Sequence, residues 1–160
     1  MAQRISSSVI ELTALAFWLG AAGFLSVATA PALFAVLPTR ELAGLVVGRV
    51  LPALFYSGMI VGVLVMVIEA LPRGAWSWRG REMLGLLILV SCVIAQAVVA
   101  PRIARLRGQI AGPIESLPAD DVRRVAFGRL HGASVAWLGI AMLAAVITLV
   151  LTARTLRSRD

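Results

Sequence analysis

The residues best suited to chemistry in this sequence are polar side chains within or beside long apolar stretches. His131 is the only histidine, and it shares a helical face with Phe127 and Ser134 at spacings of four and three residues. A single histidine can hydrogen-bond a backbone carbonyl or titrate near neutral pH, whereas haem held between two helices needs a second axial ligand. We therefore expect a hydrogen-bonding role for His131 and no haem.

Other groups that could do chemistry form no specific pattern. Soft sulfur ligands for an ion such as Cu(I) are one thiol and three thioethers: Cys92, Met59, Met66 and Met142. Methionine at such positions more often fills space in a core. The sequence contains no phosphate-binding glycine loop and no CxxC or HExxH motif. We predict no catalytic, cofactor-binding or metal-binding residues and no enzymatic activity.

Polar residues gather toward one side of the predicted membrane spans, the side of the first and third connections. The six that define this polar face are Arg40, Glu41, Tyr56, Gln96, His131 and Ser134. Polar groups in membrane segments are often functional, although most are simply hydrogen-bonded to one another. We place any functional site on this polar face.

Three carboxylates lie toward the opposite side, which carries the two termini. Glu69 and Glu82 are expected to pair with Arg73 or Arg81 near the membrane interface. Glu11 opens the first apolar run, where a negative charge suits the N-terminus of a helix.

Composition assigns the chain to a membrane. Its 160 residues are 60% hydrophobic and 14% charged, against about 45–50% and about 25% in soluble domains. A chain this short cannot hide so much apolar surface from water, which excludes a soluble globule. All fifteen basic residues are arginines that cluster between the apolar runs. There they face lipid headgroups, so we predict the lipid bilayer as a partner and no nucleic acid.

Four apolar runs, residues 12–37, 50–68, 83–100 and 133–152, are long enough to cross a bilayer. We predict an all-α integral membrane protein with one domain, 1–160, in which four transmembrane helices form two hairpins. Thr39 is the expected N-cap of a helix that runs through Pro52 to Ala70. Spans three and four are expected to extend outside the bilayer as a helical hairpin, interrupted at Gly112-Pro113 and resumed at Pro118.

Membrane helices pack closely where small residues let their backbones approach. The predicted packing residues are Gly20, Ser26, Gly58, Gly62, Ser91 and Gly132. Some of these small-residue faces could instead bind another protein. The sequence leaves that choice open.

Several strings carry a family resemblance. They are Phe17-Trp18-Leu19-Gly20, Ala30-Pro31-Ala32-Leu33-Phe34 and Leu37-Pro38-Thr39-Arg40-Glu41-Leu42-Ala43-Gly44, followed later by Pro101-Arg102-Ile103 and Leu130-His131-Gly132-Ala133-Ser134-Val135. Together they resemble a bacterial four-helix membrane family of unknown function, related to the eukaryotic transmembrane protein 205. The resemblance implies four spans in paired hairpins and no established catalytic residue. It also implies metal or small-molecule handling, because the eukaryotic relative is linked with tolerance to platinum drugs. Residues that match the pattern and would carry any site are Trp18, Pro31, Arg40, Glu41, His131 and Ser134.

Two function classes follow from these features. The first is a non-enzymatic accessory or scaffold subunit that packs with other subunits in a larger membrane complex of the respiratory or photosynthetic type. The alternative is a small homo-oligomeric transporter or tolerance factor for a metal ion or small solute. We expect a multi-pass protein of the bacterial inner membrane. The arginine count, seven on the terminal side against eight opposite, does not orient it. Three short basic segments favour cytoplasmic termini.

Overall fold

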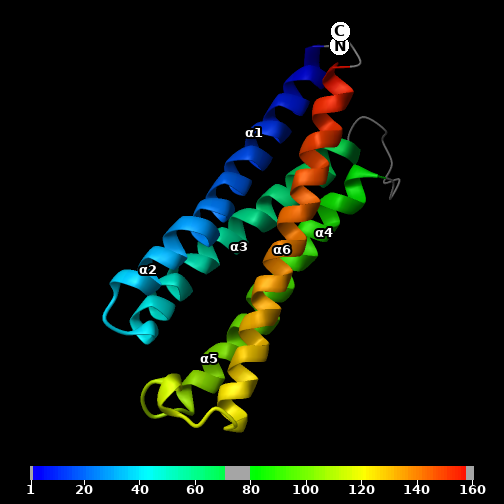
Figure 1. The fold of residues 1–160 in the computed structure, drawn as a ribbon. Coiled ribbons are helices and arrows are strands. Elements are labelled where there is room, and N and C mark those ends of the chain that lie inside the picture. Colours follow the sequence, from blue (N-terminus) through cyan, green and yellow to red (C-terminus); the bar gives the residue numbers. More distant parts are fainter. Residues whose placement is uncertain (1, 71–79, 158–160) are drawn as a thin grey trace.

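Residues 2–70 and 80–157 are described by a computed structural model (Figure 1). These residues contain four helical rods, each with a stretch long and apolar enough to cross a membrane: Ser6–Val36, Arg40–Ala70, Arg81–Gly108 and Val122–Arg157. The prediction of an all-α chain with four membrane-length helices is confirmed. Each rod is longer than its apolar run, because polar residues continue the helix past the apolar boundary.

Two rods are built from three helical segments joined end to end, and two are single helices. The first rod comprises α1 (Ala2–Phe24), the π-helical η1 (Leu25–Thr29) and α2 (Ala30–Val36). The third comprises α4 (Arg81–Val93), the π-helical η3 (Ile94–Val99) and α5 (Ala100–Gly108). The second and fourth are α3 (Arg40–Ala70) and α6 (Val122–Arg157).

The π-helical stretches lie directly before the two Ala-Pro pairs, at Pro31 and Pro101. A proline has no N–H, and its ring clashes with the carbonyl four residues earlier. The helix widens instead, so that the N–H of Ala30 bonds the carbonyl of Leu25, five residues back. The N–H of Ala100 bonds the carbonyl of Ala95 in the same way. The first and third rods therefore share one local distortion at matching places.

The rods form two antiparallel hairpins that lie close together at the end carrying both termini (Figure 1). α1 packs against α3 and α6, α3 packs against α4, and α4 packs against α6. At the opposite end, α2 and α5 lie apart in the two hairpins (Figure 1). We call the end that carries both termini the terminal end, and the opposite end the far end.

The core lies between the rods and is closed by large side chains. Trp18, Phe55 and Ile88 are each no more than 2% exposed. The indole Nε1 of Trp18 donates a hydrogen bond to the carbonyl of Leu54 at 3.0 Å, which satisfies its polar atom in the apolar interior. In contrast, Phe17 is 80% exposed. Large apolar side chains on the outer surface are suited to lipid contact.

The closest helix contact is between α3 and α4. A Cβ added at Gly62 would lie 2.8 Å from the carbonyl oxygen of Gly85 and 2.8 Å from the backbone nitrogen of Leu89. A Cβ at Gly58 would lie 2.6 Å from the Sγ of Cys92. These positions let the two backbones approach directly, as small residues do in membrane helices.

The remaining predicted packing residues divide between inside and outside. Ser91 is fully buried on α4. Gly20 and Gly132 are exposed, and a Cβ at either would meet no heavy atom within 4 Å. Ser26 is exposed and donates its hydroxyl to the carbonyl of Ala22 in its own helix at 2.8 Å. Gly20, Ser26 and Gly132 therefore lie on outward faces of their helices.

The connections at the far end are ordered by side-chain caps. Thr39 accepts a hydrogen bond from the N–H of Leu42 on its Oγ1 at 3.2 Å, as expected for the N-cap of α3. α5 ends at Gly108, and a short 3-10 helix, η4 (Ile114–Ser116), lies in the loop to α6. The predicted helical continuation of spans three and four is present, while its position outside the bilayer stays a prediction.

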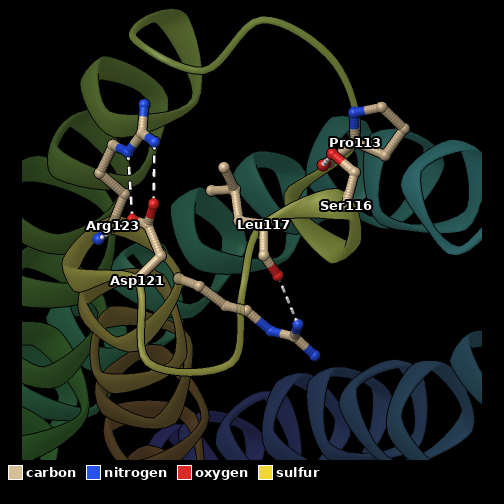
Figure 2. Close-up of polar contacts among 6 residues, drawn as sticks. Pro113, Ser116, Leu117, Asp121 and Arg123 are labelled. Carbon is tan, nitrogen blue, oxygen red and sulfur yellow. Dashed lines mark hydrogen bonds and ion pairs between the residues drawn. The ribbon is translucent and has the colours of Figure 1, made fainter.

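The expectation that the last helix begins at Pro118 is wrong, because Asp121 caps it at Val122. The Oδ1 of Asp121 accepts the N–H of Arg123 at 2.8 Å, and its Oδ2 lies 2.8 Å from the Arg123 guanidinium. Figure 2 shows Asp121 and Arg123 facing each other beside the loop. In the same view, the carbonyl of Leu117 accepts from the guanidinium of Arg124 at 2.7 Å.

This cap predicts a local pH dependence at the start of α6. The hydrogen bonds from Arg123 lower the pKa of Asp121 to about 2. A lowered pKa means that the cap contributes stability above the unfolded value, about 3.9. That stability is lost as the pH falls toward 2. We expect amide hydrogen exchange at residues 122–125, corrected for its intrinsic pH dependence, to accelerate between pH 4 and pH 2. Asp121→Asn should abolish this acceleration, and an unchanged rate in the parent chain would contradict it.

Candidate functional site

The predicted polar face is spread over three helices and does not form one cluster. Arg40 and Tyr56 are exposed on α3, and Glu41 is half-buried there. Gln96 is half-buried on η3, and Ser134 is half-buried on α6. Among the described residues, no hydrogen bond or ion pair joins any two members of this face. The side-chain oxygen of Gln96 is buried without a hydrogen-bond partner in the described part of the chain.

His131 takes part in a stack in place of the expected backbone hydrogen bond. Its ring lies 6.2 Å from that of Phe127, with an angle of 8° between the planes. The guanidinium of Arg107 lies 5.4 Å from the centre of the Phe127 ring, within the range of a cation–π contact. A Cβ at Gly44 would lie 2.8 Å from a nitrogen of the same guanidinium. Arg107 therefore links α5 to α3 and α6 at the far end.

The densest buried polar group lies at the terminal end, opposite the polar face. It is formed by Glu11 on α1, Glu69 on α3, Arg81 on α4 and Thr152 on α6, and we call it the four-helix clasp. The Arg81 guanidinium lies 2.7 Å from the Oε1 of Glu69 and donates to the Oγ1 of Thr152 at 3.0 Å. Thr152 donates its hydroxyl to the Oε1 of Glu11 at 3.1 Å. One continuous chain of polar contacts thus connects all four rods.

Three of the four clasp residues are almost completely enclosed, and the side chain of Arg81 is 20% exposed. Glu11 and Thr152 are each 1% exposed, and Glu69 is 8% exposed. Glu82, which follows Arg81 on α4, is fully buried. Because α1 begins at Ala2, Glu11 lies more than two turns inside the helix rather than at its N-terminus, which corrects the sequence-based expectation. Its Oε2 is buried and has no hydrogen-bond partner among the described residues.

Only part of the clasp follows from the sequence analysis. Arg81 is one of the two expected partners of Glu69, and the other, Arg73, lies outside the described residues. The participation of Glu11 and Thr152 was missed, because the two are 141 residues apart in the chain. A signal was present: Glu11, Glu69 and Thr152 each lie at the same-side boundary of an apolar run. Polar residues at matching depths of neighbouring helices are candidates for mutual contact.

A threonine hydroxyl can serve the clasp because it donates and accepts at once. Thr152→Val keeps the side-chain shape but removes both contacts, so we expect the free energy of unfolding to fall by about 1–3 kcal/mol. Thr152→Ser should retain most of the stability. Thr148→Val is the matched control, because among the described residues that fully buried hydroxyl bonds only the carbonyl of Ala144 in its own helix. Reversible unfolding in detergent provides the measurement. Equal effects at positions 148 and 152 would contradict the role of Thr152.

Cys92, the one thiol among the candidate sulfur ligands, is not part of a cluster of His, Cys, Asp or Glu side chains in the part of the chain that is described. No group of three or more His, Cys, Asp or Glu residues is placed there to hold an ion. Cys92 is fully buried, and its Sγ packs against Gly58. Its position is that of a core residue between α3 and α4.

Residues 13–111 match the model of a family described as a domain of unknown function, DUF4149. The chain belongs to the DUF4149 family. The matched region covers most of the first rod, α3, and the whole third rod, and therefore includes the α3–α4 glycine contact. Within the clasp, it includes Glu69 and Arg81 but neither Glu11 nor Thr152. The comparison with curated proteins and that with solved structures produced no match. A bacterial origin and a relation to transmembrane protein 205 stay predictions for this DUF4149 protein.

Proposed function

We propose that this DUF4149 protein is a non-enzymatic integral membrane subunit that packs against other membrane proteins through the outward faces of α1 and α6. The observation that carries the proposal is the outward placement of glycines that have the spacing of helix-packing residues. Glycine weakens a helix relative to alanine by roughly 0.5–1 kcal/mol. Close approach by the backbone of another helix is one condition that favours glycine at an outward position in spite of this cost.

The outward glycines belong to small-residue rows. On α6, Gly128, Gly132 and Ala136 are exposed at four-residue spacing. On α1, Ala16 and Gly20 are exposed at the same spacing. A Cβ at any of the three glycines would meet no heavy atom within 4 Å. The first rod is also the least enclosed, with 11% of its most apolar window buried against 39% for α3.

Leucine substitutions at these glycines separate folding from assembly. Gly20→Leu and Gly132→Leu should leave the unfolding temperature of the purified chain near that of the parent, because the added atoms enter open space. The same variants should lose their place in a larger particle when native membranes are solubilised gently and resolved by mass. Gly48→Leu is the matched control, because Gly48 is equally open but lies on α3. Full retention of both variants in the particle would contradict the proposal.

A second candidate function is the transport of a metal ion or small solute by a small homo-oligomer of this chain. The observation in its favour is that the Oε2 of Glu11 and the Oε1 of Gln96 are buried without a partner among the described residues. Buried polar atoms of this kind can bind a solute or water. On this alternative, Gln96→Leu, Glu41→Gln or His131→Ala should abolish solute movement in proteoliposomes while the chain stays folded. Parent-like movement would exclude the polar face as the path.

We also propose that the protein lies in a bacterial inner membrane with both termini in the cytoplasm, supported by the basic segments at that end. Single cysteines introduced at Ser116 in the far-end loop and at Arg157 in α6 test this orientation. The native Cys92 is fully buried and should react slowly. A membrane-impermeant reagent added to whole cells should label position 116 and spare position 157; the reverse pattern would invert the orientation.

A further inference from the structure

The far end of the molecule carries exposed arginines that have no partner among the described residues. They are Arg40 and Arg49 on α3, Arg102 and Arg105 on α5, and Arg129 on α6, and together we call them the arginine collar. The structure places no hydrogen bond or ion pair between any of these five guanidinium groups and another described residue. Their charges are therefore available to a ligand.

The other three arginines at this end are engaged within the chain. Arg107 covers the ring of Phe127 and reaches Gly44. Arg123 pairs with Asp121, and Arg124 donates to the carbonyl of Leu117 (Figure 2). These contacts order the loop and hold α3, α5 and α6 near one another. These contacts at the junction thus come from arginines other than the five of the collar, which are exposed.

The collar follows the ends of the apolar runs and extends along the helices, with Arg40 and Arg49 about 13–14 Å apart along α3. Each of its arginines is within five residues of the end of a run, at position 37, 50, 100 or 133. At 1.5 Å per residue, five helical residues correspond to about 7 Å. The polar headgroup layer of a bilayer is roughly 5–8 Å thick on each side. Because long arginine side chains can extend along a helix toward the interface, the collar guanidinium groups are suited to contact lipid phosphates.

Charge at this end favours an anionic ligand. Residues 37–49 and 101–131 contain eight arginines and four acidic residues, which leaves an excess of four positive charges. Two of the acidic residues, Glu115 and Asp120, are in the loop beyond the helix ends. One guanidinium group can donate two parallel hydrogen bonds to two oxygens of the same phosphate, a geometry that an ammonium group cannot reproduce.

We propose that the arginine collar binds the phosphate headgroups of anionic phospholipids in the leaflet at the far end. Each arginine near an anionic surface favours association about fivefold. The collar should therefore retain phosphatidylglycerol in preference to phosphatidylcholine when the protein is extracted from a mixed bilayer. This binding is independent of whether the protein is a subunit or a transporter.

The test uses the full chain in nanodiscs containing equal amounts of phosphatidylglycerol and phosphatidylcholine, with retained lipid measured by native mass spectrometry after mild extraction. We expect phosphatidylglycerol to dominate, and the variant Arg102→Gln/Arg105→Gln/Arg129→Gln to reduce that preference at least about tenfold. The control is Arg154→Gln/Arg157→Gln, which removes exposed arginines at the terminal end and should leave far-end retention unchanged. Unfolding temperatures in uncharged detergent establish that all variants fold.

Three outcomes would overturn the proposal. One is equal retention of the two lipids by the parent chain. Another is an equal loss of preference in the collar variant and the terminal-end control, which would indicate a general effect of net charge. The third is stabilisation in detergent by inorganic phosphate that matches the stabilisation by phosphatidylglycerol, which would assign the site to free phosphate.

Discussion

Gly62→Ala is expected to lower the free energy of unfolding of the bundle by about 1–3 kcal/mol. The added Cβ would lie 2.8 Å from both the carbonyl oxygen of Gly85 and the backbone nitrogen of Leu89. Both neighbours are backbone atoms and cannot rotate away, so α3 and α4 must separate along the most closely packed contact of the fold. Reversible unfolding of the purified chain in mixed detergent micelles measures the change.

Gly20→Ala is the matched control for this prediction. Alanine favours a helix over glycine, and the position is open, so this variant should be as stable as the parent or more stable. Opposite signs at positions 62 and 20 would show that close backbone approach, rather than helix propensity, decides the effect. A neutral Gly62→Ala would mean that α3 and α4 are further apart than described.

Arg81→Met should have the largest effect of any single change in the clasp. Breaking a buried ion pair by removing one partner lowers stability by about 3–5 kcal/mol, because a charge is left in a medium of low dielectric constant. Arg81 also donates to Thr152, so its loss disturbs the link to α1 as well as the pair with Glu69. The same unfolding measurement applies.

A double substitution separates the pair from its surroundings. Arg81→Met combined with Glu69→Gln should recover part of the lost stability, because the carboxylate left behind by the first change is removed. Arg154→Met is the control, since Arg154 is an exposed arginine on α6 at the same, terminal end of the molecule. Strictly additive effects of the two single changes would contradict a direct interaction between Arg81 and Glu69.

Much of the fold could be predicted because it depends on local patterns. The apolar runs predict the four rods, and Thr39 predicts the start of α3. Gly58 and Gly62 are spaced as helix-packing residues, and they do lie at a close contact. In each case the signal lies within a few neighbouring residues.

The candidate site was harder to predict because it depends on which faces of the helices meet. Gly20 and Gly132 carry the same local signal as Gly62, yet they face outward, and no local pattern distinguishes the two environments. The clasp joins Glu11 to Thr152 across almost the whole chain. His131 attracted interest as the only histidine, whereas the structure stacks it on Phe127. Residue type alone indicates chemistry, but contacts between distant helices decide whether it can be used.

The most direct test of the proposed role is the mass and composition of the particle that contains this chain after gentle solubilisation of native membranes. We expect a large particle in which the chain is present at fixed stoichiometry with other membrane proteins. A monomer or a small assembly of this chain alone would contradict the subunit proposal and favour transport instead.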